Sequence, residues 1–272
     1  MPIKILERAS HAPNERVCVY GPPKTGKSRL ATSVPTGRDS PWGEKVLYVC
    51  ADAGSDNLRP VMTKYRGDIV PIVMEGKDLL EESVEIATKD WKKEVPGAGT
   101  LVWDTMTETS KQLLQQYANS GVFSDNHAVQ VGKRGTKSWH TSPMQGDYGA
   151  AQNSVGYILE HLWTQPLNII VLFHQRWIEP KKNSADGLMG GPEICGREGV
   201  RWIPGKFDNV FRTERVNSGP ASEAKFIVHT TQRGIWHAGY RSNKASGGLP
   251  GAVQLQPDPG HFWIDFLKEV RG

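Results

Sequence analysis

The sequence predicts an α/β fold with a mainly parallel, doubly wound sheet to which late antiparallel strands are added. Apolar runs of strand length recur along the 272 residues, and segments with helical spacing lie between them. Several of these runs are unbroken rather than alternating, which is typical of strands whose two faces are both covered by helices. The alternation of such strands with helices indicates a parallel sheet.

The expected elements follow one another in a regular order. The apolar runs VCVY, KVLYVCAD, DIVPIVM, GTLVWD and LNIIVLFH predict strands at 17–20, 45–52, 68–74, 99–104 and 167–174. Helical spacing between them predicts helices at 78–94, 104–119 and 146–164. Further along, FDNVFRTERV and AKFIVHTTQ are expected to be the late antiparallel strands, and HFWIDFLKEV a short closing helix.

Two long stretches interrupt this alternation. Residues 119–147 and 176–206 are polar, basic and rich in glycine, and the second contains GLMGGP. Loops of this length are uncommon in a compact domain and are usually functional or disordered. Without an internal repeat or a clear boundary, we expect one domain over 1–272, with a core at about 14–245 and a tail at 246–272.

The composition is that of an ordinary soluble globular protein. Hydrophobic residues make up 38% and charged residues 23% of the chain. No apolar stretch approaches the ~20 residues that a membrane-spanning helix needs, and the first residues lack the apolar region of a signal peptide. We therefore expect a cytoplasmic protein with no membrane partner.

Cysteine and charge add weaker constraints. The cysteines Cys18, Cys50 and Cys195 are too few and too scattered for a disulfide framework, and none forms a C-x-x-C pair. We expect Cys18 and Cys50 to be small core residues. The net charge of +4 permits nucleic-acid binding without demonstrating it.

The motif with the most specific chemistry is GPPKTGKS at residues 21–28, which matches G-x-x-x-x-G-K-[ST] in full. It follows a predicted strand and opens a predicted helix, the context that distinguishes a phosphate loop from an ordinary Gly/Pro turn. Gly21 and Gly26 would let the backbone N–H groups point at phosphate oxygens. Lys27 would place its charge at the β- and γ-phosphates, and Ser28 would offer a hydroxyl to Mg²⁺. The expected nucleotide-binding residues are Gly21, Pro22, Pro23, Lys24, Thr25, Gly26, Lys27, Ser28 and Arg29.

A partner carboxylate for this loop should end a buried strand, and Asp104 at the end of TLVWD fits that position. Its expected role is to hold Mg²⁺ through water, together with Ser28. The alternative is that Asp104 caps the helix that starts at Thr105, and both roles are compatible.

The residue that activates water distinguishes two classes of ATPase. AAA+ machines carry a Glu directly after the magnesium Asp, and Thr105 occupies that position here. RecA-like ATPases place the carboxylate at the end of a different strand, where this chain has Asp52 in YVCADAGSD. Asp52 could orient the attacking water, or could be a turn-forming residue in A-D-A-G. Glu108, one turn into the next helix, is a weaker candidate.

The order and spacing of GPPKTGKS, YVCADAGSD, LVWDT and IIVLFHQ resemble those of phage RecA-type recombination ATPases, the short RecA-core proteins associated with single-strand annealing. The resemblance spans about residues 14–245. It implies a RecA-like P-loop NTPase fold with ATP and Mg²⁺ as cofactors and, for a phage-encoded protein, a location in the host cytoplasm.

The resemblance also implies further catalytic residues. The family has a polar sensor of the γ-phosphate at the end of the last core strand, where this chain has Gln175. The preceding His174 replaces the usual Asn and is most simply a hydrogen-bonded core histidine. Near the end of the core, Arg241 and Lys244 stand where family members carry basic residues that act on a neighbouring subunit, although an exposed basic turn would have the same composition.

The family has two DNA-binding loops, and the two long stretches 119–147 and 176–206 lie in the corresponding places. Basic side chains there would neutralise backbone phosphates, and tryptophans could stack on bases without reading their identity. The alternative is that both are solvated charged loops. The residues concerned are Lys133, Arg134, Lys137 and Trp139 in the first stretch, and Arg176, Trp177, Lys181 and Lys182 in the second.

The leading hypothesis is an ATPase that binds single-stranded DNA and promotes recombination or annealing, as a homo-oligomeric ring or filament, with a single-strand-binding protein as a further candidate partner. Asp52 in place of the family's Glu shortens the carboxylate by one methylene, so hydrolysis is expected to be slow. Two alternatives remain: a hexameric helicase-type motor, and a nucleotide-dependent switch that does not bind DNA.

Overall fold

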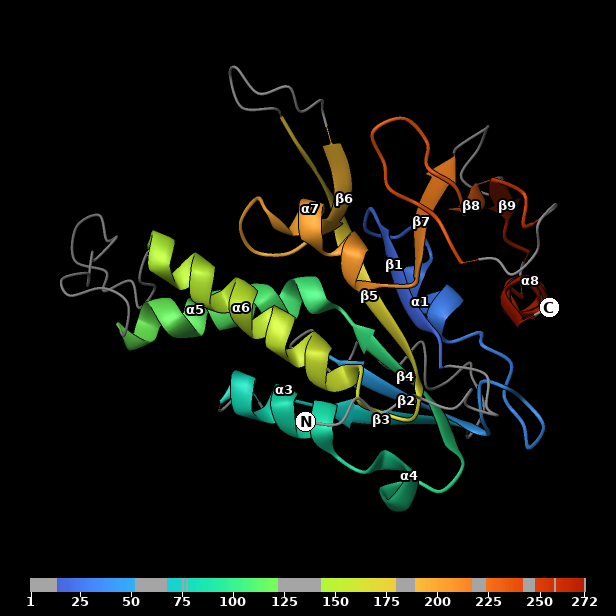
Figure 1. Cartoon of the computed structure of the whole chain (residues 1–272), viewed down its shortest axis with the longest axis horizontal. Coiled ribbons are helices and arrows are strands. Elements are labelled where there is room, and N and C mark those ends of the chain that lie inside the picture. The colour runs from blue at the N-terminus through green and yellow to red at the C-terminus, as the bar shows by residue number, and fades with distance from the viewer. Residues whose placement is uncertain are drawn as a thin grey trace, which may run out of the picture.

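In the part of the chain that the structure describes, a nine-stranded sheet forms the centre. The computed structural model describes residues 14–51, 68–74, 76, 78–121, 143–179, 189–216, 224–241, 248–256 and 258–271. Along the sheet the strands run β3-β2-β4-β5-β1-β7-β8-β9, and β6 pairs with β5 (Figure 1). The parallel part consists of β3 (Ile69–Val73), β2 (Lys45–Cys50), β4 (Ala98–Asp104), β5 (Asn168–Ile178), β1 (Arg16–Gly21) and β7 (Asn209–Val216). The antiparallel strands are β6 (Met189–Glu193), β8 (Lys225–His229) and β9 (Ala252–Gln254).

Helices cover both faces of this sheet, as the unbroken apolar runs predict. On β1, Cys18 and Tyr20 face one apolar cluster while Val17 and Val19 face the other, because successive side chains of a strand point to opposite faces. The first cluster is completed by α3 (Leu79–Thr88), α5 (Met106–Ser120) and α6 (Gln145–Leu162), and the second by α1 (Lys27–Ala31) and α8 (Gly260–Arg271). The short elements are α4 (Trp91–Glu94), α7 (Gly199–Trp202) and η2 (Pro204–Lys206). The predicted mainly parallel, doubly wound α/β fold with late antiparallel strands is confirmed.

Two expectations about individual elements are wrong. The segment FDNVFRTERV forms β7, which pairs parallel to β1 with Val17 opposite Asn209, so the late antiparallel strands of the described residues are β8 and β9. After α7 and η2 the chain enters β7 at the edge of the sheet where β1 also begins, so β7 runs in the same direction as β1. The expected helix 78–94 is divided at Lys89, whose ψ of 139° is extended, because Asp90 begins α4 by accepting a hydrogen bond from the N–H of Lys93.

The described parts of the stretch 176–206 include strand and helix rather than loop alone. β5 continues to Ile178 and pairs with β6, which contains the glycines of GLMGGP. Gly190 is required there because an added Cβ would lie 2.4 Å from the ring of Trp236. Residues 180–188, between the two strands, lie outside the described part of the chain. The hairpin of β5 and β6 therefore projects from the sheet as an extension of a core strand.

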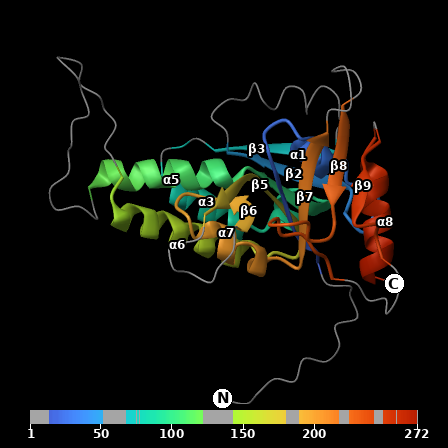
Figure 2. The same ribbon diagram turned by 90° about the horizontal axis from the view of Figure 1, so that it is seen from above.

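The C-terminal helix α8 is held against the second face by aromatic packing. Trp263 lies with its ring 5.1 Å from that of Trp42 in an edge-to-face arrangement, and its Nε1–H donates to the carbonyl oxygen of Leu30 in α1. At the other end of α8, Arg271 pairs with the buried carboxylate of Glu15, just before β1. In Figure 2, α8 lies at the β8–β9 end of the sheet, away from α5 and α6. No helix in the described ranges is long and apolar enough to cross a membrane.

Replacing Trp263 tests this packing. Trp263→Ala should lower the free energy of unfolding by about 3–5 kcal/mol, because it leaves a cavity beside Trp42 and removes the bond to Leu30. Urea denaturation measures the change. The control is Asp265→Ala, which lies on the exposed side of α8. It should change the free energy of unfolding by less than about 0.5 kcal/mol. Equal losses in the two variants would contradict the packing role of Trp263.

Candidate nucleotide-binding site

The phosphate loop, residues 21–28, lies at the carboxyl edge of the parallel strands. Gly21 is opposite His174 at the end of the core part of β5, and Tyr20 is opposite Arg212 of β7. Cys50 and Asp104 are paired at the ends of β2 and β4. In open α/β sheets, ligands bind at this edge because loops and helix N-termini gather there.

The two glycines of the loop serve different purposes. Gly26 has φ 87° in the left-handed region and precedes α1, a conformation that a side chain would strain. An added Cβ on Gly21 would instead lie 2.3 Å from Oγ1 of Thr213, so this glycine gives β7 room to approach. The hydroxyls of Thr25 and Thr213 then meet at 2.7 Å and join the loop to β7.

Lys27 is folded back over the loop. Its side chain is only 6% exposed, and Nζ donates to the carbonyl oxygens of Gly21 at 3.0 Å and Pro22 at 2.8 Å. Burial lowers its pKa to about 8, an effect that the charge of Asp104 partly opposes. The ammonium group is therefore already desolvated and hydrogen-bonded inside the loop, at the position where phosphate oxygens would replace the carbonyls.

Ser28 and Asp104 meet across the end of β5. Ser28 Oγ donates to Asp104 Oδ2 at 2.6 Å, and the hydroxyl of Tyr48, from β2, donates to the same oxygen. Burial, followed by the charge of Asp104, raises the pKa of Tyr48 well above its usual value and keeps it a donor. Thr105 rather than Asp104 caps α5, accepting from the N–H of Glu108 at 3.2 Å, so the alternative capping role of Asp104 is wrong.

This pair fits a magnesium ion. Mg²⁺ is usually held by one or two protein oxygen ligands, with water and substrate phosphates completing its octahedron. Within the described ranges, no group of three His, Cys, Asp or Glu is arranged to hold a metal by itself. Ser28 and Asp104 together supply two oxygens of this kind, which suits an ion that a bound nucleotide also holds.

The expected sensor Gln175 lies beside the loop and is held by a residue that sequence patterns did not indicate. Arg212 Nε donates to Gln175 Oε1 at 3.3 Å. This contact uses the carbonyl oxygen of the amide and not its NH₂ group. His174 donates its backbone N–H to Thr107 Oγ1 at 2.9 Å, and its ring is partly exposed. Burial, with the charges of Lys27 and Lys111, lowers the pKa of His174 and favours its neutral form.

Arg212 belongs to a cluster that connects β5, β7 and β8. Its Nη1 donates to Glu214 Oε2 at 3.2 Å, and the same oxygen lies 2.8 Å from Nε2 of the buried His229. The guanidinium also lies 4.6 Å from the ring centre of Trp236, which packs on Gly190 of the hairpin. The only local sign of this cluster is the spacing of Arg212 and Glu214, two residues apart and so on one face of a strand.

The other expected residues fall in different places. Arg176 and Trp177 lie on β5 itself: Arg176 Nη1 donates to the carbonyl of Gly196 at 3.0 Å, and Trp177 is 54% exposed. Arg241 pairs with Asp208 at 3.4 Å where β7 begins, at the opposite edge of the sheet from the phosphate loop. Glu108 pairs with Lys111. Outside the described residues lie Asp52, Lys133, Arg134, Lys137, Trp139, Lys181, Lys182 and Lys244.

Together, the phosphate loop, the Ser28–Asp104 pair and the order of the parallel strands define a RecA-like P-loop ATPase domain. The family described as "AAA domain" (AAA_24) matches residues 13–242, and the chain belongs to it. Thr105 caps a helix at the position where the AAA+ class carries its catalytic Glu, so the family name does not by itself identify the residue that activates water.

Among solved structures, the chain is similar to the KaiC-like protein PH0186 from the hyperthermophilic archaeon Pyrococcus horikoshii OT3. The sequences are 12% identical, the TM-score is 0.43, and the match covers 79% of this chain and 77% of that one. Among curated proteins, none matches this sequence.

The contribution of Glu214 should depend on pH. Burial would raise its pKa, but the hydrogen bond from His229 and the charge of Arg212 outweigh this and hold the pKa below 4.5. The carboxylate therefore stabilises the fold above its ordinary pKa, and this stabilisation is lost as the pH falls through the lowered value. Glu214→Gln should cost about 1–2 kcal/mol of unfolding free energy at pH 7 and less below pH ~4.

Urea denaturation at several pH values measures this difference. The matched control is Glu160→Gln, which removes a surface carboxylate paired with Lys206 and should cost less than about 0.5 kcal/mol at every pH. A cost for Glu214→Gln that stays constant between pH 7 and pH ~3.5 would contradict the charged interaction with Arg212 and His229.

Proposed function

We propose that this chain is an ATPase that binds single-stranded DNA and promotes homologous recombination or strand annealing. The observation that carries the proposal is the course of β5. The strand passes the phosphate loop at His174, carries Gln175 next, and two residues later exposes Trp177 on the hairpin with β6. One continuous strand therefore joins the phosphate-loop edge of the sheet to a surface that exposes an aromatic side chain, which we propose stacks on DNA bases.

In this proposal the nucleotide is held by the residues already in contact around the loop. Lys27 exchanges the carbonyls of Gly21 and Pro22 for phosphate oxygens, and backbone N–H groups of the loop complete the cradle. Ser28 and Asp104 hold Mg²⁺, which when bound would neutralise charge on the β- and γ-phosphate oxygens. Asp52 remains the candidate that orients the attacking water.

Gln175 is the proposed link between nucleotide and hairpin. Because Arg212 holds its carbonyl oxygen, the NH₂ group is the end that can donate to a γ-phosphate. A shift of Gln175 caused by this hydrogen bond would be transmitted along β5 to Arg176 and Trp177. The same change reaches β6 through Arg212 and Trp236, whose ring packs on Gly190. Ligand-dependent ordering of a segment by a γ-phosphate is a common switching device.

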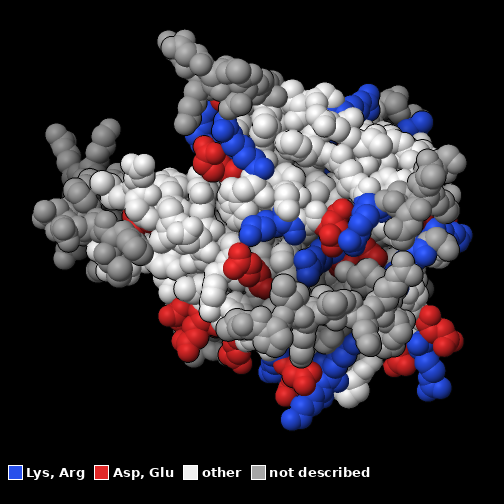
Figure 3. All heavy atoms as spheres, in the orientation of Figure 1, with Lys and Arg blue, Asp and Glu red and all other residues white. Residues whose placement is uncertain are grey.

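DNA contact would come from Trp177 by stacking and from basic residues of both long stretches by phosphate neutralisation. On the face drawn in Figure 3, the blue and red side chains of the described residues are interspersed rather than gathered into one basic surface. The DNA part of the proposal therefore depends on the hairpin and on Lys133, Arg134, Lys137, Trp139, Lys181 and Lys182.

A homo-oligomer is part of the same proposal. Arg241 lies at the edge opposite its own phosphate loop and could act only on the nucleotide of a neighbouring subunit, as would Lys244. The proposal includes a ring or filament in the cytoplasm, with a single-strand-binding protein as a further partner. The alternatives are a hexameric helicase-type motor and a switch that binds ATP without DNA.

Two substitutions test the ATPase chemistry. Lys27→Ala should abolish ATP binding and turnover, because it removes the charge that phosphate oxygens would meet. Asp104→Asn should retain nucleotide binding but lower Mg²⁺-dependent turnover about 100-fold or more, because the ion loses its carboxylate. Phosphate release with and without Mg²⁺ measures both. The control Lys206→Ala removes a surface lysine paired with Glu160 and should turn over normally; normal turnover in Lys27→Ala would refute the proposed site.

The DNA proposal is tested at Trp177. With a non-hydrolysable ATP analogue, Trp177→Ala should weaken binding of labelled single-stranded DNA about 10-fold, the loss expected from one stacking contact. Tyr157→Ala removes an aromatic side chain that is similarly exposed, at 50% on α6, and should bind DNA normally. Fluorescence anisotropy at two salt concentrations provides the affinities.

The result separates the three hypotheses. Salt-dependent binding, with ATP turnover that rises on adding single-stranded DNA, is expected for the proposed function. Absence of binding at low salt, or turnover unchanged by saturating DNA, would favour the switch. Displacement of a strand from a forked duplex would favour the helicase-type motor.

A further inference from the structure

Tyr48 gives Asp104 a second hydrogen-bond donor at the edge of the sheet where the phosphate loop lies. The side chain of Tyr48 is 2% exposed, and its hydroxyl donates to Asp104 Oδ2, the same oxygen that accepts from Ser28 Oγ. Among the described residues, Asp104 Oδ1 receives no hydrogen bond. The two donors therefore occupy one oxygen of the carboxylate and leave the other as a further acceptor.

The length of a tyrosine side chain explains how β2 makes this contact. Tyr48 is opposite Val102 and Cys50 is opposite Asp104, so Tyr48 starts two residues before the end of β4. Two residues of a strand span about 7 Å, a distance that the long tyrosine side chain bridges. Tyr48, Cys50 and Val102 face the apolar cluster that α1 covers, and Asp104 follows Val102 on the same face because side chains alternate. The hydroxyl therefore reaches the end of β4 on the side from which Ser28 also approaches.

The acceptor distinguishes Tyr48 from a tyrosine that is only satisfied in the core. Tyr20, buried on β1, donates to the backbone carbonyl of His237, and the hydroxyl of Tyr117, on α5, shares a hydrogen bond with the hydroxyl of Ser154. Such neutral partners are enough to satisfy a buried phenol. Tyr48 instead donates to a carboxylate, and hydrogen bonds to an ionised group are roughly twice as strong. The bond is therefore suited to fixing the orientation of that carboxylate.

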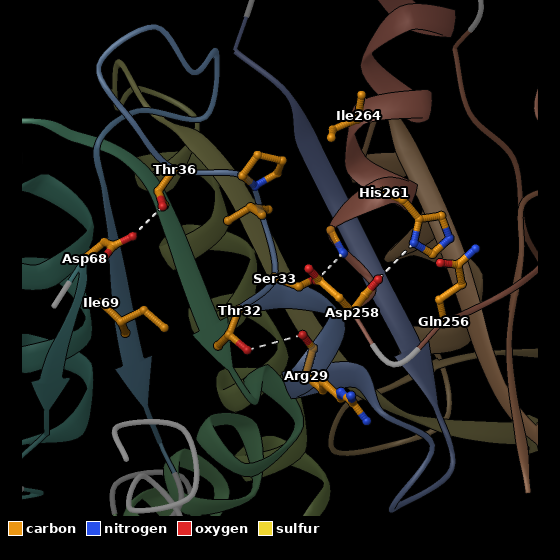
Figure 4. A pocket seen from close by; sticks show the side chains of 13 residues that line it. Arg29, Thr32, Ser33, Thr36, Asp68, Ile69, Gln256, Asp258, His261 and Ile264 are labelled. Carbon is orange, nitrogen blue, oxygen red and sulfur yellow. Dashed lines mark hydrogen bonds between the residues drawn. The ribbon is translucent and has the colours of Figure 1, made fainter. Parts of the chain in front are cut away.

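The parts of the site around this carboxylate are held by other contacts. The backbone of Asp104 lies in β4 and is paired with β2. Ser28 is held from the far end of α1, where Thr32 Oγ1 donates to its carbonyl oxygen at 2.8 Å. The same hydroxyl lies 3.3 Å from the carbonyl oxygen of Arg29, beside a cavity of about 680 Å³ between α1 and α8 (Figure 4). Rotation of the Asp104 side chain is then the freedom that the Tyr48 hydroxyl restricts.

We propose that Tyr48 is a positioning residue for the magnesium ion that a bound nucleotide brings to this site. Its hydroxyl and that of Ser28 hold Asp104 Oδ2, so the carboxylate keeps one orientation and Oδ1 remains for a water molecule of the ion. Mg²⁺ requires a nearly ideal octahedron and retains several waters, so a carboxylate that turns would hold it less well. Groups that orient the ligands of a metal in this way contribute about 10- to 100-fold in metal affinity. This inference rests on the proposed nucleotide-binding function.

The substitution Tyr48→Phe removes the hydroxyl and keeps the ring that fills the core. Isothermal titration of the full chain with a non-hydrolysable ATP analogue gives the affinity with the metal chelated by EDTA and again with saturating Mg²⁺. Tyr48→Phe should bind the analogue normally in EDTA and lose about 10-fold of the affinity that Mg²⁺ adds. The matched control Tyr117→Phe removes a tyrosine hydroxyl on α5 and should keep the full gain from Mg²⁺.

A second comparison shows whether Tyr48 acts through Asp104. Asp104→Ala removes the acceptor and should itself reduce the affinity that Mg²⁺ adds. Tyr48→Phe introduced into Asp104→Ala should reduce it no further, because the effects of residues that act as one unit are not additive. A further loss of about 10-fold in the double variant would overturn the inference.

The other outcomes separate the inference from the proposed function. A full gain from Mg²⁺ in Tyr48→Phe would overturn the inference and leave the proposed phosphate loop intact. So would an equal loss of affinity with EDTA and with Mg²⁺, which is the result expected of a tyrosine that only supports the fold. Failure of the unchanged protein to bind the analogue, or to bind it more tightly with Mg²⁺, would overturn the proposed function itself.

Discussion

The contact between Ser28 and Asp104 is the interaction on which the arrangement of the site depends. It requires β1 and β4 to run in the same direction and to end at one edge, although β5 lies between them in the sheet. The Tyr48 hydroxyl, from β2, donates a hydrogen bond to the same carboxylate oxygen of Asp104. A parallel sheet provides this convergence because its carboxyl ends share an edge, and burial of both faces keeps the strands in register.

Burial at this edge has a consequence for Lys27. A charged ammonium group is costly in a desolvated place unless it is hydrogen-bonded. The carbonyls of Gly21 and Pro22 supply those bonds, so the loop without phosphate is satisfied by its own backbone. Phosphate oxygens offer the same kind of acceptor with a full negative charge, and charge-assisted hydrogen bonds are the stronger ones.

β5 connects the site to the rest of the molecule. Its core part is buried between β4 and β1, while its continuation leaves the sheet and forms the hairpin with β6. Arg212 contacts Gln175 on this strand, Glu214 on β7 and the ring of Trp236, so a single guanidinium touches both β5 and the support of the hairpin. Only an arginine combines a planar stacking surface with several directed donors in this way.

The sequence by itself determined the features that depend on neighbouring residues. The phosphate loop was predictable because its residues are contiguous, and the strands were predictable because unbroken apolar runs mark burial on both faces. Asp104 followed from its place at the end of such a run. The family match and the observed sheet agree with these local signals.

Only the tertiary structure decided the direction of β7, the hairpin inside 176–206, the Arg212 cluster and the cavity between α1 and α8. Each depends on contacts between distant parts of the chain, such as Arg212 with Gln175 or Trp263 with Leu30. The period of apolar residues tells which face of a strand is buried, but not which strand lies beside it or in which direction. Those choices are made by packing the whole chain at once.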